Sequence, residues 1–203
     1  MAAQVVVLDP QKRERRRQIL EAAKHVFAEA GYHGASIHAI IDRADIARGT
    51  FYLYFESKSA VFSAILDEAM EQLRRHMHRI DVDAPNVPPP QVQLRTQVIG
   101  AIEFVVQDRP LAMLLLSAGH TPDAEAAERL DQFFGEVRDL LRRAFESGQE
   151  IKMLRKVQPP LLAAAMLGMI RGVVEHIITQ PDAPTVETVV DEILMVALRG
   201  VLA

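Results

Sequence analysis

The segment RADIARGTFYLYFESK, residues 43–58, gathers side chains that can bind a polar, negatively charged partner. The hydroxyls of Tyr52 and Tyr54 donate well to phosphate oxygens. Arg48 can reach a phosphate or the O6 and N7 atoms of guanine, and Thr50 offers both a hydroxyl and a methyl group. We therefore select as candidate DNA contacts Ser36, Arg48, Gly49, Thr50, Tyr52, Tyr54 and Lys58.

Two of these candidates, Gly49 and Lys58, are selected partly because of the backbone at their positions. Gly49 lets the main chain approach a partner closely because it has no side chain. Lys58 falls in the first turn of the next predicted helix, where free N–H groups also favour an anion. Phe51 and Phe55 lie four residues apart, on one side of a helix. We therefore expect both phenylalanines in the core and the polar members of the segment, Lys58 included, facing outward.

The elements that must position these side chains have helix-turn-helix spacing. Apolar residues recur at helical intervals from Arg15 to Ala30, and Gly31 suits the left-handed residue that follows a helix. Ser36 is a predicted N-cap for a second helix, and a turn at 44–45 precedes a third segment, 46–54. In such a motif the last helix reads the major groove. The spacing indicates DNA binding. It leaves open the alternative that the aromatic residues of the third segment only pack in the protein core.

The rest of the chain predicts an all-α fold of about nine helices. Beyond the first three, we expect helices over 58–80, from 91 to a break at 108–110, over 110–119, 121–148, 159–179 and 185–202, with a proline-rich loop at 81–90. We assign residues 1–56 to a helix-turn-helix domain, in which 1–10 form a disordered arm. We assign 57–203 to a helical domain for effector binding and dimerisation.

Composition excludes several other classes of protein. The chain has no cysteine, so disulfides, thiolate metal sites and a cysteine nucleophile are absent. Motifs for nucleotide binding or hydrolysis are also missing, and His76 and His78 point to different sides of a helix, so we predict no enzyme, metal or cofactor. The apolar run 159–170 is shorter than the ~20 residues of a membrane span and predicts a buried helix, so we expect no membrane partner and a cytoplasmic protein.

Net charge is −4 overall, but residues 1–60 hold nine basic and seven acidic residues, a net of +2. The basic cluster QKRERRRQ begins the first helix. Such a cluster is commonly a solvated helix face, and it is also compatible with a nucleic-acid surface.

The stretch from Arg16 to Phe62 resembles the N-terminal domain of TetR-type (TetR/AcrR) transcriptional regulators. The resemblance rests on the F-x-x-x-G-Y ending of the first helix and on GTFYLYFESK. It implies a repressor that binds a pseudo-palindromic operator as a homodimer through its last two helices, and a small apolar effector that releases it. An alternative within the same fold is a structural or cell-division factor without an effector.

This chain departs from the family pattern at two positions. Asp45 stands where glycine is usual, and asparagine and aspartate tolerate the left-handed region better than most residues. Ala47 replaces the usual serine or threonine, so we expect Asp45 to cap the recognition helix in its place.

A methionine-rich set in the second domain predicts either a packed core or an apolar effector cavity. Its members are Phe104, Met113, Leu116, His120, Phe133, Phe134, Met166, Met169 and Ile170. We expect the effector's polar end near His120 or Arg171. Arg171 can instead pair with Glu175 at a dimer interface, and Gly168 with Gly172 permits close helix packing there.

Overall fold

The computed structural model describes residues 10–117 and 123–199. Residues 1–9 of the predicted arm, together with Gly119, His120, Thr121 and Pro122, lie outside this description. Within it the chain forms helices and no strand, in agreement with the predicted all-α class. The helices are α1 (Pro10–Gly34), α2 (Ile37–Ala44), α3 (Arg48–Tyr52), α4 (Lys58–His76), α5 (Pro90–Gln107), α6 (Arg109–Leu116), α7 (Ala124–Glu150), α8 (Pro159–Thr179) and α9 (Val186–Arg199).

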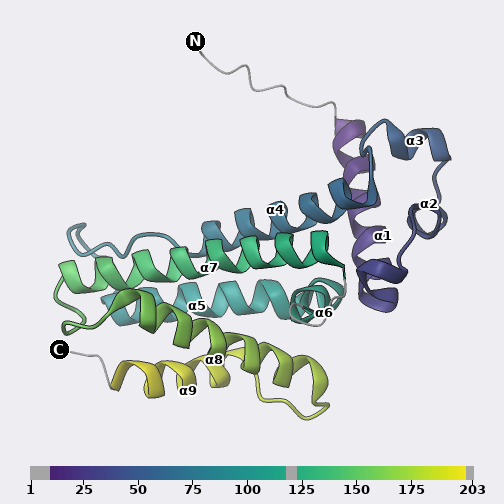
Figure 1. Cartoon of the computed structure of the whole chain (residues 1–203). Coiled ribbons are helices and arrows are strands. Elements are labelled where there is room, and N and C mark those ends of the chain that lie inside the picture. The colour runs from purple at the N-terminus through teal and green to yellow at the C-terminus, as the bar shows by residue number, and fades with distance from the viewer. Residues whose placement is uncertain (1–9, 118–122, 200–203) are drawn as a thin grey trace.

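The first three helices form a head at one end of the molecule (Figure 1). Helix α1 begins at Pro10, five residues before the predicted start and inside the predicted arm, because proline suits a first helical position. Its regular part ends at Gly31, whose φ of 67° confirms the need for glycine there. Ser36 caps α2 as predicted, accepting a hydrogen bond from the backbone N–H of Ala39 at 3.1 Å.

Helix α4 leaves the head and joins a layered bundle with the remaining helices. It lies along α7, with α5 behind them and α8 and α9 forming the opposite layer (Figure 1). Helix α6 sits at the junction, packed against α1 on the head side and against α5 and α8 on the bundle side. The geometry gives α4 and α6 contacts with both parts of the molecule.

Several predicted helix ends are wrong. Helix α6 ends at Leu116 rather than at 119, α7 begins at Ala124 rather than at 121, and α3 spans Arg48–Tyr52 rather than 46–54. Helix α4 ends at His76 rather than near residue 80, and the following loop is held by its own turn, in which Asp81 accepts from the N–H groups of Asp83 and Ala84. Gly148 does not end α7, which continues to Glu150. A Cβ atom at Gly148 would lie 2.7 Å from Leu154 Cδ1, so this glycine makes room for the returning chain.

Helix α8 is less buried than its sequence predicts. By length and composition it is the one helix among the described residues able to cross a membrane, yet only 28% of its most apolar window is buried. One side packs against α5, α6 and α7, while Leu161 is 68% exposed. Gly168 and Gly172 also lie on exposed positions, and no atom falls within 4 Å of a Cβ built on either. An apolar, small-residue surface therefore remains uncovered within the protomer.

Candidate nucleic-acid interface and ligand cavity

The turn before α3 depends on Asp45. Its φ of 49° and ψ of 54° place it in the left-handed region, and its N–H bonds back to the end of α2. The expectation that Asp45 also caps α3 is wrong, since Ala47 is the N-cap and no side chain caps this helix. Asp45 lies two residues before this N-cap, and the side chain that accepts from the first turn is ordinarily that of the N-cap residue itself. The turn survives without glycine, and α3 starts without a capping side chain.

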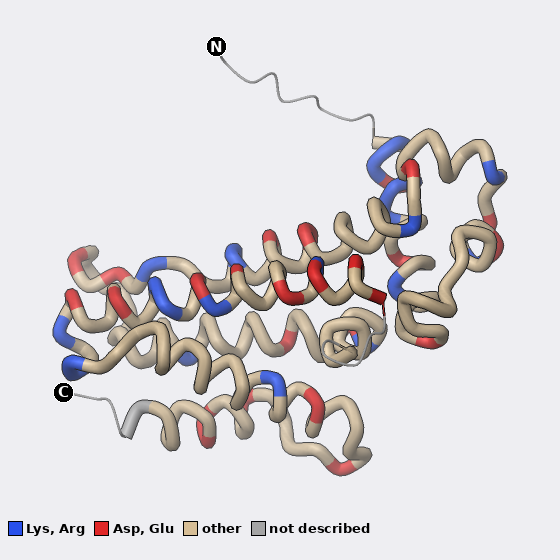
Figure 2. The backbone as a smooth tube through the Cα atoms, viewed as in Figure 1, with Lys and Arg blue, Asp and Glu red and all other residues tan. Residues whose placement is uncertain are grey.

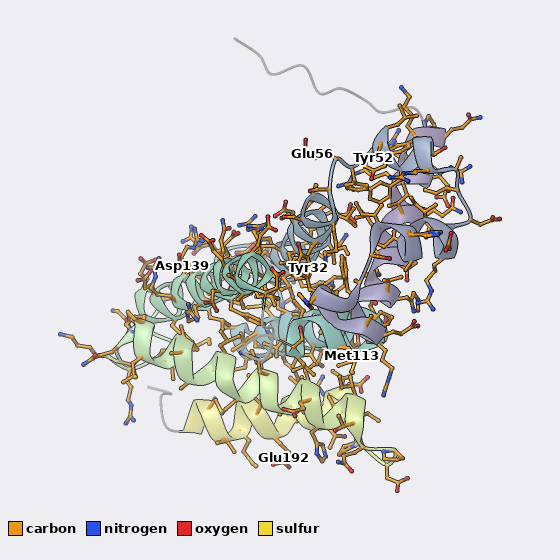
Figure 3. All side chains as sticks on the ribbon, turned by 45° about the vertical axis from the view of Figure 1, so that its right-hand side comes forward. Tyr32, Tyr52, Glu56, Met113, Asp139 and Glu192 are labelled. Atoms are coloured by element: carbon orange, nitrogen blue, oxygen red, sulfur yellow. The ribbon has the colours of Figure 1, made fainter. Side chains whose placement is uncertain are left out.

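Helix α3 has a buried and an exposed side. Phe51 is fully buried and Phe55 is 6% exposed, which confirms both as core residues. Tyr52 is 46% exposed, and the guanidinium carbon of Arg48 lies 5.9 Å from its ring centroid. Figure 3 shows Tyr52 on the head, whereas Tyr32 lies where the head meets the bundle. Arg48 and Tyr52 therefore form a joint polar surface on the outer side of α3.

The other candidate contacts are placed less uniformly. Gly49 is exposed with no atom within 4 Å of a built Cβ, so a partner can approach the backbone there. Thr50 is half-buried. Tyr54 is half-buried and packs against the core, contrary to the expectation that it faces outward. Ser36 uses its hydroxyl for the α2 cap, which leaves that oxygen committed to the protein.

The prediction that Lys58 faces outward is wrong. Its ammonium donates to the carbonyl oxygens of Tyr32 at 2.7 Å and Ala35 at 3.1 Å, and it lies 4.3 Å from the Tyr32 ring centroid. These carbonyls lie at the end of α1, where partial negative charge attracts a cation. Lys58 thus ties the start of α4 to the end of α1.

Sequence reasoning missed Leu53, which follows α3 and is 82% exposed beside Tyr52. An exposed apolar side chain of this kind can contact a thymine methyl group. Its position directly after the candidate contacts of α3 was the available signal.

Basic residues gather at the N-terminal end of α1 on the head (Figure 2). Several are engaged: Arg16 pairs with Glu68, Arg17 pairs with Glu14 at 2.5 Å, and Arg15 donates to Gln18 at 2.7 Å. Exposed pairs of this kind are weak, so the arginines can exchange partners for phosphates at small cost.

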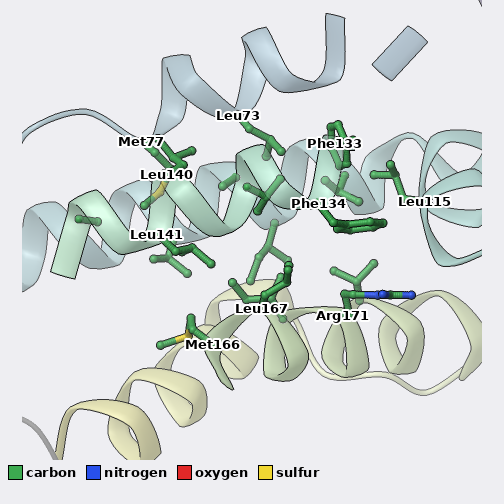
Figure 4. A pocket seen from close by; sticks show the side chains of 18 of the residues that line it. Leu73, Met77, Leu115, Phe133, Phe134, Leu140, Leu141, Met166, Leu167 and Arg171 are labelled. Carbon is green, nitrogen blue, oxygen red and sulfur yellow. The ribbon is translucent and has the colours of Figure 1, made fainter. Parts of the chain in front are cut away.

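The bundle holds an apolar cavity of about 140 Å³, which is lined mainly by α5, α7 and α8 with contributions from α4, α6 and α9 (Figure 4). Five predicted ligand residues line it: Leu116, Phe133, Phe134, Met166 and Ile170. Phe104, Met113 and Met169 do not. Phe104 lies instead 6.3 Å from the His76 ring, Met113 is 41% exposed, and Met169 packs against the core at the side. His120 lies outside the described residues.

Arg171 is the one charged residue among the described side chains that line this cavity. Its guanidinium carbon lies 4.7 Å from the Phe134 ring centroid, at one end of the cavity (Figure 4). Most of the lining was missed from sequence, including Leu73 and Met77 of the α4 end and Val98 and Ile102 of α5. Their helical periodicity marked them as buried, but periodicity does not separate a cavity wall from a filled core.

A polar cluster joins the head to the bundle. Glu125 of α7 accepts from the Ser59 hydroxyl at 2.6 Å and from the Tyr32 hydroxyl at 3.3 Å. Burial, followed by the charge of Glu125, raises the pKa of Tyr32 to about 12. The phenol therefore stays neutral and remains a donor across the physiological range.

Comparison with known proteins agrees with this architecture. Residues 19–65 match the family described as bacterial regulatory proteins, tetR family. The HTH-type transcriptional repressor KstR of Mycobacterium tuberculosis is 30% identical over 139 residues, which are 68% of this chain and 61% of that repressor. The fatty acid metabolism regulator protein of Bacillus subtilis is 25% identical over 143 residues, 68% of this chain and 72% of that protein.

A solved structure extends the likeness to nearly the whole chain. FadR from Bacillus subtilis in complex with stearoyl-CoA superimposes with a TM-score of 0.73 at 21% identity, covering 91% of this chain and 98% of that one. At that identity the likeness establishes the fold alone. Together with the matched head, these findings show that the chain belongs to the TetR family of bacterial regulatory proteins.

Proposed function

We infer that this chain is a transcriptional regulator, acting in the cytoplasm, that binds duplex DNA through α2 and α3. Residues 1–56 form the DNA-binding domain and residues 57–203 the effector and dimerisation domain. The observation that carries the inference is the outer side of α3, where Arg48 and Tyr52 are exposed together over a fully buried Phe51. A donor pair on a short helix after a tight turn suits base and phosphate contacts.

One such helix contacts too few base pairs to specify a site, so the function needs two heads. The exposed surface of α8, with Leu161 and the two glycines, and Val196 of α9, which is 66% exposed, supports a homodimer through the last two helices. Two-fold pairing sets the recognition helices about one DNA turn apart, ~34–36 Å, which requires a pseudo-palindromic operator.

The apolar cavity supports a ligand-responsive repressor over the alternative, a structural or cell-division factor without effector. A volume of about 140 Å³ is roughly ten times the space that holds one water molecule. Relatives point the same way: one is named a fatty acid metabolism regulator, and the FadR structure contains stearoyl-CoA. A small, largely apolar molecule that favours one arrangement of the two heads lowers operator affinity by its differential affinity for that arrangement.

Selection from randomised duplexes, followed by fluorescence anisotropy across a salt series, tests the DNA-binding function. We expect a pseudo-palindrome and a linear fall of log affinity with log salt. Absence of salt-dependent binding to any duplex would overturn the inference. A lipophilic compound library, scored by thermal shift and then by loss of operator binding, tests the ligand response. DNA binding with no responding compound would favour the alternative function.

A further inference from the structure

A second pocket, of about 530 Å³, is lined by the end of α4, the start of α5 and the end of α7. These helix ends lie at the end of the bundle away from the head (Figure 1). The second pocket adjoins the apolar cavity, because the same side chains line both. The shared lining consists of Met77, Leu94, Leu140, Ala144 and Phe145. The two spaces are therefore neighbours with a common wall, and their chemistry differs, because one lining is apolar and the other carries polar and charged side chains.

Gln97 of α5 is the strongest sign of a missing partner. Its side chain lines the second pocket and is 4% exposed, yet its Nε2 has no hydrogen-bond partner among the described residues. A buried amide without a partner costs free energy, and native proteins keep such groups rarely and for a reason. Nε2 is a donor only, so the partner it lacks is an acceptor such as a carbonyl, carboxylate or phosphate oxygen.

The rim of the same pocket is basic. Arg74, Arg79 and Arg143 line it together with His78, against a single lining carboxylate, Glu150. Arg74 is committed to Glu136 at 2.6 Å, and Arg79 acts electrostatically on Asp81. Arg143 is exposed and makes one hydrogen bond, from Nε to the Asp139 carbonyl at 3.3 Å. Arg79 and Arg143 thus remain able to hold an anion.

The size of the apolar cavity limits the ligand's tail. A cavity of about 140 Å³ resembles the engineered cavities, near 150 Å³, that hold one benzene molecule. It therefore accepts an apolar group of roughly six carbons. The basic pocket adjoins this cavity across Phe145 and Leu140, so it is the space that we assign to a longer or polar part of the ligand.

We propose that the effector is an anionic amphiphile whose short acyl or aryl tail fills the apolar cavity. An acyl oxygen accepts a hydrogen bond from Gln97 Nε2, and the anionic head lies at Arg79 and Arg143. This deepens the proposed ligand response and moves the ligand's polar end from Arg171 to the opposite end of the cavity. Two kinds of molecule combine an acyl oxygen with an anionic head group. One is a free carboxylic acid, and the other is a thioester that carries phosphate groups.

Isothermal titration with the full chain tests the proposal, using hexanoate, hexanoyl-coenzyme A, hexan-1-ol and hexylammonium as probes. We expect an anionic probe to bind at least about tenfold tighter than the alcohol and the ammonium. Tightest binding of hexanoate identifies the carboxylate as the head group. Tightest binding of the coenzyme A ester identifies the phosphate-bearing thioester.

Three variants locate the contacts. Gln97→Met keeps the length of the side chain and removes the donor, so we expect about tenfold weaker anion binding and an unchanged or raised melting temperature. Arg143→Gln should weaken the binding of the anionic probes and leave the binding of hexan-1-ol unchanged. Arg138→Gln, an exposed arginine on the same helix outside both pockets, serves as the control and should match the unmodified chain.

Several results would overturn the proposal. One is equal binding of all four probes. Another is unchanged anion binding in both Gln97→Met and Arg143→Gln. A third is loss of binding only in Arg171→Gln, which would return the head group to the other end. Because these outcomes concern head-group selectivity, they leave the DNA-binding function standing, which fails only if the duplex assays fail.

Discussion

Lys24 of α1 donates a hydrogen bond to the carboxylate of Asp108, and the same carboxylate accepts from the Leu111 N–H at 3.0 Å to cap α6. One side chain therefore couples the DNA-binding head to a short helix beside the cavity. Burial by itself lowers the pKa of Lys24, but its bonds to Asp108 and Glu21 outweigh burial and raise the net pKa. The ammonium is charged at neutral pH.

Asp108→Asn tests this coupling because asparagine keeps the cap and removes the charge. We expect ligand binding to persist while the ligand's effect on operator affinity shrinks by roughly threefold or more. Glu21→Gln is the matched control, since it removes the other partner of Lys24, at 2.7 Å, within α1. Equal ligand effects on operator affinity in the two variants would argue against transmission through Asp108.

Arg48→Ala should reduce affinity for the selected operator by ~1–3 kcal/mol if the guanidinium reads a guanine. Binding to unrelated duplexes should change less, so the ratio of specific to non-specific affinity falls. Anisotropy titrations with both duplexes measure this ratio, and Arg138→Ala on α7 is the control. A uniform loss on both duplexes would instead assign Arg48 to a phosphate.

Lys58→Ala should destabilise the fold by roughly 1–3 kcal/mol, because two carbonyl oxygens at the end of α1 lose their charged donor. Urea unfolding measures the change, with Lys156→Ala at an exposed site as the reference. Unchanged stability together with a smaller salt slope for DNA binding would restore Lys58 as a phosphate contact.

Tyr32 should ionise late. Its pKa of about 12 lies above the ordinary 10.0, so its contribution to stability is complete below pH 10 and is lost as pH rises toward 12. The chain has three tyrosines and no tryptophan, which makes phenolate absorbance easy to follow. Tyr32→Phe should remove the late step from the titration. If a late ionisation step persists in Tyr32→Phe, that step belongs to another tyrosine.

Val196→Asp should shift the protein toward a monomer of 22.6 kDa, since a charge at a buried dimer contact is costly. Light scattering at micromolar concentration reads the mass. Leu53→Asp is the matched control, because Leu53 is also apolar and strongly exposed, at 82% against 66% for Val196, but lies on the head. If the mass falls in neither variant, α9 is not part of the dimer interface.

The local elements were determined by the sequence alone. The cap at Ser36, the positive φ at Gly31 and Asp45, and the burial of Phe51 and Phe55 all follow from residues within a few positions of each other. Such signals act through backbone dihedrals and single hydrogen bonds, which do not depend on distant packing. The helix-turn-helix and most helix boundaries were predictable for this reason.

Tertiary structure decided the rest. Lys58 turns inward because the end of α1, more than twenty positions away, presents free carbonyls. Gly148 lies inside a helix because Leu154 needs its space. The cavity wall combines residues of α4, α5, α7 and α8, and Gln97 lacks a partner only because of what those helices bring near it. Each outcome depends on contacts between segments far apart in the chain, which helical periodicity does not encode.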